Sequence, residues 1–483
     1  MRYSNPLLYA DLSDPDMIRV GVDYYLTASS FTYVPGLPVL HSRDLVHWEI
    51  IGYAALSLPD SRYSQPAHGC GIWAPSIRYH HGLFYIYACM PDEGLYAWTA
   101  ENPAGPWSCH LVKKVTGWID PCPLFDESGT WLIHGFAASR IGINNILYIH
   151  RLSGDGLSVL DKGHRVYDGA EHGDITVEGP KLYRRNGMYW ILCPAGGVCS
   201  GYQLALRSSD LFGPYERRVV LSQGATPVNG PHQGGWVDDG SGGNWFIHFQ
   251  DVGPYGRIPH LQPVDWSDGW PVMGDRGTPV LSGEINLTPY PLSIPLTDHF
   301  ESDLGIVWQW QANPDPAWFD LMKPGLRLHA VYADSLDRAG HFLSRLMLFR
   351  NFNMDVHLSV SGSPHNLLAG IGLMGRIWHY AAVNGERIFL VRGSGNGKEQ
   401  ELMSLPCNSS KVTLRLHISE GFASFYFCTA KDSFLPLGDA FPMTPGGWTG
   451  ARPGIFCLSR FPNSSGYADF SSVCFSESPC STE

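Results

Sequence analysis

Basic residues are scarce in this chain of 483 residues. Lys and Arg together number 33 against 45 Asp and Glu, which gives a formal net charge of −12. Proteins that bind nucleic acids collect phosphates with a positively charged surface, so this balance argues against a nucleic-acid partner. Long hydrophobic runs are also missing. None approaches the roughly 20 apolar residues of a membrane-spanning helix, and the first residues lack the apolar segment of a signal peptide. We therefore expect no membrane association.

Several short catalytic motifs are absent as well. The sequence contains no Cys/His spacing typical of zinc sites, no glycine-rich phosphate loop and no G-x-S-x-G turn, which argues against metalloprotease, kinase and esterase functions. Its eleven cysteines are odd in number and lie mostly inside apolar segments. Buried thiols explain them better than disulfides, so we expect a reducing, cytoplasmic location. We expect no organic cofactor, and a homo-oligomer stays open.

Turn residues and aromatic residues, by contrast, are abundant. The chain has 54 Gly, 36 Pro and 13% aromatic residues, a composition that suits an all-β protein. A unit of strand, tight turn and aromatic strand occurs five times at intervals of roughly 50–60 residues, which is within the range of propeller blades. The five units open at Asp14, Trp73, Asp120, Glu178 and His232. We predict a five-bladed β-propeller over residues 1–287.

The remainder of the chain follows a different pattern. The segment 288–296 is rich in proline, which is typical of a linker. From 297 to 483, strand-like runs continue without the repeat; examples are 326–330, 356–360, 411–416 and 423–427. Alternating strands at short spacing predict a β-sandwich. The predicted fold class is therefore all-β, with a propeller followed by a sandwich.

Three of the five units open on a carboxylate: Asp14, Asp120 and Glu178. The innermost strand of each blade lines the axis of a propeller, so we expect these side chains to point into one pocket. Two carboxylates on opposite sides of a sugar hydrolyse a glycosidic bond, one protonating the leaving oxygen and the other activating water or attacking. A third acid raises the pKa of the donor by like-charge repulsion. The pattern predicts a glycosidase, although an isolated Asp-Pro pair is more often a turn opener.

The first carboxylate is ambiguous among its neighbours, because Asp11, Asp14 and Asp16 lie close together. The Asp-Pro pair that Asp14 shares with Asp120 selects Asp14. Should Asp14 prove dispensable, Asp11 or Asp16 would be the next candidate.

Other candidate site residues each have a plain structural alternative. His248 closes the returning strand of the fifth unit and is followed by oxygen-bearing side chains, which suits a cation site, although a lone strand histidine is usually a hydrogen-bonded core residue. Arg257 either clamps sugar hydroxyls or lies on a surface loop. Phe31 and Trp73 either stack on a sugar ring or pack in the core.

With these motifs in place, the chain resembles glycoside hydrolase family 43, and specifically its β-xylosidase and α-L-arabinofuranosidase members. The resemblance is carried by S-D-P-D at 13–16, G-I-W-A-P at 71–75, W-I-D-P at 118–121, T-V-E-G-P at 176–180, H-Q-G at 232–234 and H-F-Q at 248–250. The segments D-H-F at 298–300 and W-Q-W-Q-A-N-P at 308–314 are similar to the start of the family's accessory domain. The resemblance thus implies a propeller followed by a jelly-roll, concanavalin-like β-sandwich over nearly the whole chain.

The resemblance also implies a role for each site residue. It makes Asp14 the general base, Glu178 the general acid and Asp120 the residue that orients the acid and modulates its pKa. It implies that Arg257 contacts the substrate and that His248 holds a divalent ion, usually calcium, in the axial channel. The further expected substrate-binding residues are Phe31, Trp73 and Gln233. The expected partner is an oligosaccharide.

We therefore expect an exo-glycosidase that removes xylose or arabinose from short oligosaccharides. Inversion needs carboxyl groups about 6.5–9.5 Å apart and retention about 5–5.5 Å, and the separate blades of Asp14 and Glu178 favour the wider gap. Three alternatives stay open: a predominantly arabinofuranosidase enzyme, a retaining hydrolase of the sucrose-cleaving kind, and a non-catalytic sugar-binding propeller. The sequence decides neither between xylose and arabinose nor whether the sandwich contributes to the pocket.

Overall fold

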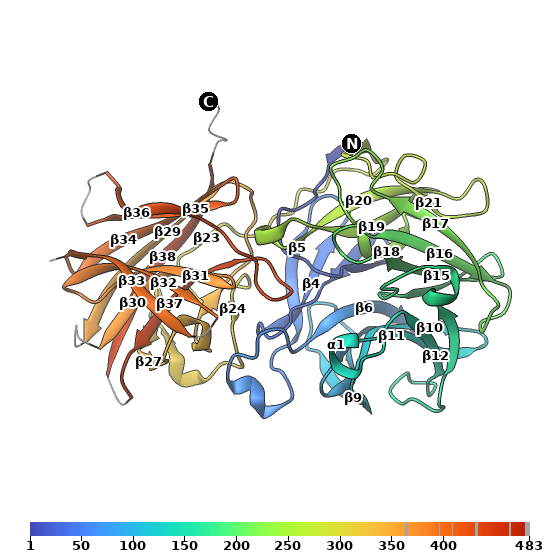
Figure 1. Cartoon of the computed structure of the whole chain (residues 1–483), viewed down its shortest axis with the longest axis horizontal. Helices are drawn as coiled ribbons and strands as arrows, with labels where there is room; N and C mark the ends of the chain where they lie inside the picture. The colour runs from blue at the N-terminus through green and yellow to red at the C-terminus, as the bar shows by residue number, and fades with distance from the viewer. Residues whose placement is uncertain (363–365, 396, 408, 430–432, 463–464, 479–483) are drawn as a thin grey trace.

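The computed structural model of the chain is almost entirely β-structure and has two halves (Figure 1). It describes residues 1–362, 366–395, 397–407, 409–429, 433–462 and 465–478. The N-terminal half is a five-bladed β-propeller and the C-terminal half is a β-sandwich, which confirms the predicted fold class. Helical segments of the described residues are short, and none is long and apolar enough to cross a membrane. They are α1 (Ala138–Ile141), η1 (Ser61–Ser64), η2 (Gly169–His172), η3 (Gly253–Tyr255), η4 (Pro316–Trp318) and η5 (Leu336–Arg338).

Each blade is a sheet of four consecutive antiparallel strands. Blade one contains β2 (Asp16–Val20), β3 (Asp23–Thr27), β4 (Gly36–Ser42) and β5 (Glu49–Ala55), and blade two contains β6 (Trp73–His80), β7 (Leu83–Met90), β8 (Gly94–Ala100) and β9 (Ser108–Lys114). Blade three contains β10 (Trp118–Asp126), β11 (Gly129–Phe136), β12 (Ile146–Arg151) and β13 (His164–Asp168), and blade four contains β14 (Lys181–Arg185), β15 (Met188–Ala195), β16 (Tyr202–Ser208) and β17 (Glu216–Ser222). Blade five contains β18 (His232–Asp238), β19 (Asn244–Asp251), β20 (Arg257–Asp265) and β21 (Val272–Met273).

The innermost hairpins form because their turns suit the twist of the strands. Between β14 and β15, Asn186 and Gly187 have φ values of 51° and 75°, and between β6 and β7, His81 and Gly82 have φ values of 48° and 86°. Two consecutive positive φ angles are the mark of a type I′ turn, which matches the right-handed twist of paired strands. The turn residues seen in the sequence therefore fix the register of these blades.

The ring of blades is closed by the two ends of the propeller segment. β1 (Arg2–Ser4) pairs with β22 (Ser282–Glu284), and the Asn5 side-chain amide donates to the carbonyls of Leu261 and Val280 at 2.8 Å each. Around the axis, β2 lies between β6 and β18, and β10 lies between β6 and β14. The five inner strands therefore surround one axis.

Within the described residues, the sandwich consists of two sheets of eight strands each. One sheet contains β23 (Thr297–Asp298), β25 (Phe319–Leu321), β26 (Leu326–His329), β29 (Phe352–Gly362), β34 (Lys411–Ser419), β35 (Phe422–Cys428), β36 (Leu435–Pro442) and β38 (Gly466–Glu477). The other contains β24 (Gln309–Trp310), β27 (Val331–Tyr332), β28 (Leu343–Ser344), β30 (Leu367–Met374), β31 (Ile377–Val383), β32 (Arg387–Ser394), β33 (Lys398–Pro406) and β37 (Arg452–Ser459). Alternate side chains such as Val356, Leu414 and Ile371 are buried in one shared core.

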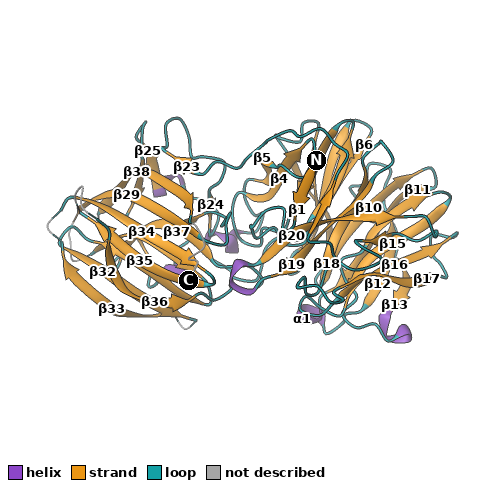
Figure 2. Cartoon of the chain, turned by 90° about the horizontal axis from the view of Figure 1, so that it is seen from above, coloured by secondary structure: helices purple, strands orange, loops and turns teal. Residues whose placement is uncertain are grey.

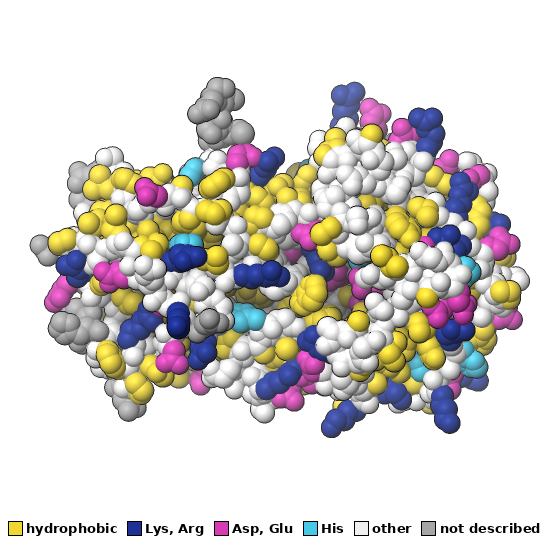
Figure 3. Space-filling model, in the orientation of Figure 1, with side chains coloured by type: hydrophobic (Ala, Val, Ile, Leu, Met, Phe, Trp, Pro, Cys, Tyr) yellow, Lys and Arg dark blue, Asp and Glu magenta, His cyan; other side chains and the backbone are white. Residues whose placement is uncertain are grey.

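The two domains lie side by side (Figure 2) and are joined by a common core. Trp48 of blade one belongs to the same hydrophobic cluster as Trp308 of the sandwich segment. Val34 and Trp310 also exchange two backbone hydrogen bonds, of 2.9 and 2.6 Å. The sandwich is therefore fixed against blade one. The surface is hollowed where the domains meet, and side chains of both charges are intermingled on that face (Figure 3).

Candidate active site

All seven predicted catalytic and substrate-binding residues line one cavity of about 280 Å³. They are Asp14, Phe31, Trp73, Asp120, Glu178, Gln233 and Arg257. The cavity lies where the inner strands converge, and each blade, or the loop that leads into it, contributes at least one of these side chains. Trp448 of the sandwich lines the same cavity. Both domains therefore build the site.

The backbone around the cavity adopts a rarely used conformation. Asp14, Phe31, Asp120 and Gln233 have positive φ angles of 54°, 52°, 58° and 27°, a region that non-glycine residues seldom occupy. Asp120 and Gln233 each lie at a register shift in an inner strand, β10 and β18 respectively. A bulge of this kind re-aims a side chain, here into the cavity. The sequence pattern places Asp120 ahead of its strand, whereas the structure places it inside the strand at the bulge.

Asp14 is held by two hydrogen-bond donors. Its Oδ1 accepts from Arg257 Nη1 at 3.0 Å, and its Oδ2 accepts from Ser29 Oγ at 2.6 Å. The Ser29 oxygen in turn accepts from the backbone N–H of Ala74 at 2.7 Å. Charge-assisted bonds of this kind fix a carboxylate in one orientation. Asp14 is therefore arranged to accept a proton from a water molecule in the cavity.

Glu178 and Asp120 act on each other through the backbone and through their charges. Asp120 Oδ2 accepts a 2.7 Å hydrogen bond from the N–H of Gly179, the residue directly after Glu178. Burial, reinforced by the charge of Asp120, raises the pKa of Glu178, and burial together with the charge of Asp14 raises the pKa of Asp120. Because two neighbouring acids do not both ionise readily, the pair holds a proton to higher pH than an isolated carboxyl group does. Glu178, whose side chain is 28% exposed, is the member that can deliver it to a substrate.

Two further buried side chains lie next to these acids. Lys181 of β14 donates from Nζ to Ser76 Oγ of blade two at 2.7 Å, and its charge opposes the rise in the pKa of Asp120. His232 Nε2 lies 3.5 Å from Glu178 Oε1. Burial lowers the pKa of His232 to about 3, so this ring faces the acid in its neutral form. No sequence motif points to Lys181, because a lysine at the start of a strand is ordinarily exposed.

Four aromatic side chains line the cavity: Phe31, Trp73, Phe136 and Trp448. We call Phe31, Trp73 and Trp448 the aromatic rim, because their rings lie next to one another. The ring centroid of Trp73 lies 6.3 Å from that of Phe31 and 6.1 Å from that of Trp448. Trp448 comes from the loop between β36 and β37 of the sandwich, within the sequence G-G-W-T-G at 446–450. Sequence reasoning missed this residue. Its one signal is a large aromatic side chain flanked by glycines, which is typical of a loop tip that presents the ring to a ligand.

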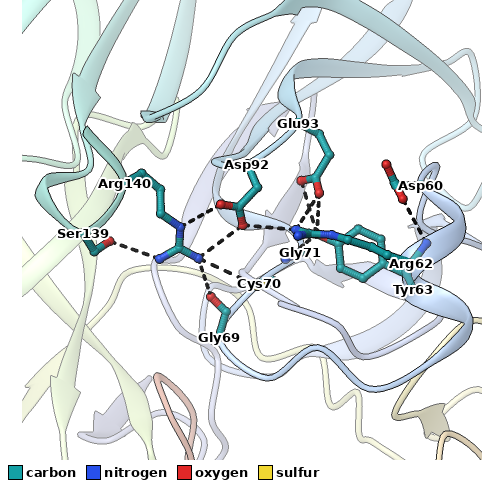
Figure 4. Close-up of polar contacts among 10 residues, drawn as sticks. All are labelled: Asp60, Arg62, Tyr63, Gly69, Cys70, Gly71, Asp92, Glu93, Ser139 and Arg140. Atoms are coloured by element: carbon teal, nitrogen blue, oxygen red, sulfur yellow. Dashed lines mark hydrogen bonds and ion pairs between the residues drawn. The ribbon is translucent and has the colours of Figure 1, made fainter.

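A network of charged side chains, drawn in Figure 4, contacts the rim at Trp73. The Arg140 guanidinium from α1 lies over the Trp73 ring, 4.8 Å from its centroid, a favourable cation–π contact. Its Nε and Nη2 donate to the Asp92 carboxylate at 3.0 and 3.3 Å. Asp92 also accepts from Arg62 Nη2 at 3.1 Å. These contacts join blade three to blade two and to the segment that follows blade one, and they fix the orientation of Trp73.

His248 lies outside the cavity and is fully buried in β19. Its Nδ1 donates to the carbonyl of Phe249 at 3.0 Å, and its Nε2 accepts from the Gln262 amide at 3.2 Å. The oxygen of that amide accepts from the Val280 N–H at 2.7 Å, which fixes the orientation of the amide. Calcium prefers oxygen ligands, and the described part of the chain holds no group of three His, Cys, Asp or Glu side chains arranged for a metal ion. The surroundings of His248 therefore do not fit the expected calcium site, and we derive no step through an ion.

The two domains match known sequence families separately. Residues 3–271 match the sequence model of glycosyl hydrolases family 43, and residues 297–476 match that of the beta xylosidase C-terminal concanavalin A-like domain. A putative beta-xylosidase from Xylanibacter ruminicola is 38% identical over 475 residues, which cover 95% of this chain and 86% of that protein. A non-reducing end alpha-L-arabinofuranosidase from Bacteroides ovatus is 30% identical, with 97% of this chain and 93% of that protein covered.

A solved structure agrees with these matches over both domains. The crystal structure of a family 43 protein from Bacillus licheniformis has a TM-score of 0.86 and 25% sequence identity to this chain, and the match covers 99% of this chain and 100% of that one. The propeller, its cavity lined by three acids and the sequence matches agree. The chain belongs to glycoside hydrolase family 43.

Proposed function

We propose that this glycoside hydrolase is an inverting exo-enzyme that releases terminal xylose, arabinofuranose or both from short oligosaccharides. The observation that carries the proposal is the contrast between two carboxyl groups in one small cavity. Asp14 accepts two hydrogen bonds, one of them from a guanidinium, whereas burial and the charge of Asp120 raise the pKa of Glu178 so that it keeps its proton. Direct displacement of a glycosidic oxygen by water needs one base and one acid of this kind.

In the proposed reaction, a water molecule attacks the anomeric carbon while Asp14 takes one of its protons. The bond between the anomeric carbon and the glycosidic oxygen breaks, and Glu178 transfers its proton to that oxygen. Asp120 orients Glu178 through the N–H of Gly179, and its negative charge keeps the proton on Glu178 until the reaction. After turnover Asp14 is protonated and Glu178 is ionised, and proton exchange with solvent restores the starting state.

The size and border of the cavity support exo action. About 280 Å³ lies just below the usual range of small-molecule pockets and is space for one sugar ring rather than for several in a row. The faces of Phe31 and Trp73 offer apolar surface for that ring, and Arg257 and Gln233 offer donors to its hydroxyls. A chain end fits such a site better than the middle of a polysaccharide.

The stereochemical outcome tests the direct displacement. We expect the enzyme to release α-xylose from a β-xyloside, because the two acids come from separate blades, one and four, and direct displacement by water needs the wider separation of the two carboxyl groups. Proton NMR of the anomeric signals in the first minutes, before mutarotation, distinguishes the two products. A β-xylose signal that appears first would refute inversion and favour the retaining mechanism.

The choice of sugar is tested by comparing three substrates. Relatives of this chain carry the names beta-xylosidase and alpha-L-arabinofuranosidase, so we expect activity on an aryl β-xyloside, on an aryl α-L-arabinofuranoside or on both. An aryl β-galactoside serves as the negative control. Activity confined to the arabinofuranoside would establish the predominantly arabinofuranosidase alternative, and activity on the galactoside alone would refute the proposed substrate class.

We also propose a cytoplasmic location for the protein. Cys89, Cys193 and Cys457 are buried free thiols, and burial raises the pKa of each of them. Such thiols act as small packing residues rather than as reactive groups, which suits a reducing compartment. Cell fractionation with an activity assay would test the location, and activity confined to the extracellular fraction would contradict it.

A further inference from the structure

Asp11 is a buried carboxylate that lies beside the cavity without lining it. Its Oδ1 accepts from the backbone N–H of Arg257 at 2.9 Å and from Ser13 Oγ at 3.0 Å. Its Oδ2 accepts from the backbone N–H of Gly450 at 2.9 Å. Arg257 begins β20 of blade five, and Gly450 belongs to the sandwich loop that carries Trp448. One carboxylate therefore joins blade one, blade five and the sandwich.

The three segments are closely packed at Gly256 and Gly450. A Cβ atom added to Gly256 would lie 2.4 Å from the Asp11 carboxyl group and 2.7 Å from the nitrogen of Gly450. A Cβ atom added to Gly450 would lie 2.6 Å from the carbonyl of Tyr255. Gly256 also has a φ of 83°, which favours glycine. The sandwich loop therefore meets blade five backbone to backbone, and the Asp11 side chain fills the junction.

Two of the segments that Asp11 joins lead into the cavity. We call them the Arg257 arm, which begins β20, and the Trp448 arm, which is the sandwich loop that ends at Gly450. Trp448, two residues before Gly450, borders the cavity, and the Arg257 side chain holds Asp14. We propose that Asp11 is a positioning residue that sets the place of Trp448 in the aromatic rim and the place of the Arg257 guanidinium beside Asp14. The Arg257 arm rests on the proposed function, in which Asp14 is the general base. The Trp448 arm concerns sugar binding and does not depend on that assignment.

A carboxylate suits the junction because each arm requires an acceptor. The Arg257 N–H reaches one oxygen of Asp11 and the Gly450 N–H reaches the other. Asparagine has nearly the same shape but carries one acceptor oxygen and one NH₂ donor. In an Asp11→Asn variant, the backbone N–H of either Arg257 or Gly450 must face the NH₂ group of the asparagine. One of these two hydrogen bonds is therefore lost, and the segment that it holds moves away from residue 11.

The test combines Asp11→Asn and Trp448→Ala in a double-mutant cycle. Kinetics are measured with 4-nitrophenyl β-D-xyloside and 4-nitrophenyl α-L-arabinofuranoside, and binding of D-xylose and L-arabinose by calorimetry. We expect Asp11→Asn to lower kcat/KM by about ten- to a hundredfold, as for loss of a hydrogen bond to a charged group, and to weaken sugar binding. In the Trp448→Ala background the same change should weaken sugar binding much less, because the side chain that Asp11 positions is already gone.

Asp16→Asn is the matched control. Asp16 is also a buried acid near the start of blade one, but its Oδ2 binds the Ile77 N–H at 2.9 Å and Arg78 Nη1 at 2.6 Å and so joins blade one to blade two. The Asp16→Asn substitution should lower the thermal unfolding temperature. It should leave kcat/KM near the wild-type value at temperatures where the variant and the wild-type protein are both folded.

Two results would overturn the role of Asp11. One is an Asp11→Asn variant with wild-type kinetics and sugar affinity. The other is an equal loss of sugar affinity with and without Trp448, which would mean that Asp11 does not act through the place of Trp448. Failure of the proposed function is distinguishable from both, because an Asp14→Asn variant that keeps full activity would refute the general base without changing the calorimetric result for Asp11.

Discussion

Replacing Asp120 by asparagine removes one charge from the cavity and keeps an acceptor for the Gly179 N–H. Part of the raised pKa of Glu178 comes from burial and part from the charge of Asp120. As a measure of size, two unit charges about 7 Å apart in an effective dielectric constant of about 20 interact by about 2 kcal/mol, which corresponds to roughly 1.5 in pKa. We therefore expect the pKa of Glu178 to fall by about that amount in Asp120→Asn.

The sign of the effect on activity follows from the role of Glu178 as the acid. An acid works only while it is protonated, so activity is lost as the pH rises through the pKa of Glu178. A lower pKa moves this basic limb of the pH profile to lower pH, by roughly 1.5. The rate at neutral pH should also fall, because a lower pKa of Glu178 leaves a smaller fraction of it protonated there.

The assay is kcat/KM against pH with xylobiose, which reports groups of the free enzyme. Xylobiose is preferred to an activated aryl glycoside, because its sugar leaving group needs the proton that Glu178 donates. Glu178→Gln is the control and should lose the basic limb altogether. A basic limb that stays in place or moves to higher pH in Asp120→Asn would refute the idea that the charge of Asp120 sets the pKa of Glu178.

Three further predictions follow from the site. Asp14→Asn should lower kcat by about 10²–10⁴-fold with an unchanged fold, as is typical for loss of a general base; near-normal activity would contradict its role. Because the folded-state pKa of Glu178 is raised, the stability linked to its proton is present at low pH and lost as the pH rises through the raised value. Glu178→Gln should therefore raise Tm near pH 9 and leave it unchanged near pH 4, and a lower Tm than wild type near pH 9 would disprove this. Exhaustive chelation should leave activity and Tm unchanged, because both ring nitrogens of His248 are hydrogen-bonded; a loss restored by calcium would reinstate the ion.

The inner hairpins and the three acids were predictable from the sequence because both depend on local chemistry. Asn186 and Gly187 favour positive φ angles wherever they occur together, so the turn and its two strands could be assigned without any tertiary information. The Asp-Pro pairs at Asp14 and Asp120 stand at equivalent positions of repeated units, so their convergence on the axis follows from the repeat. The cavity that contains both residues together with Glu178 is the place that this reasoning predicts.

Contacts between distant segments could not be predicted in this way. Asp11 and Gly450 are 439 positions apart, and Lys181 and Ser76 are 105 positions apart, and no local pattern encodes either pair. His248 is a different case, in which strand pairing adds a contact that the sequence does not show. Its neighbours in the sequence suit a cation site, but Gln262 on the adjacent strand occupies its second ring nitrogen, and that contact is set by the pairing of β19 with β20.

The pairing of β1 with β22 also sets an order of events during synthesis of the protein. The amino group of Met1 and the carbonyl of Ile285, which bond at 2.6 Å, are 284 positions apart. A ribosome adds about 5–20 residues per second, so the first strand waits roughly 15–60 s for its partner. Until then, β1 has no partner strand, and its backbone N–H and C=O groups stay open to water and to other nascent chains. A pause in translation before residue 285 would therefore prolong the exposure of this strand edge.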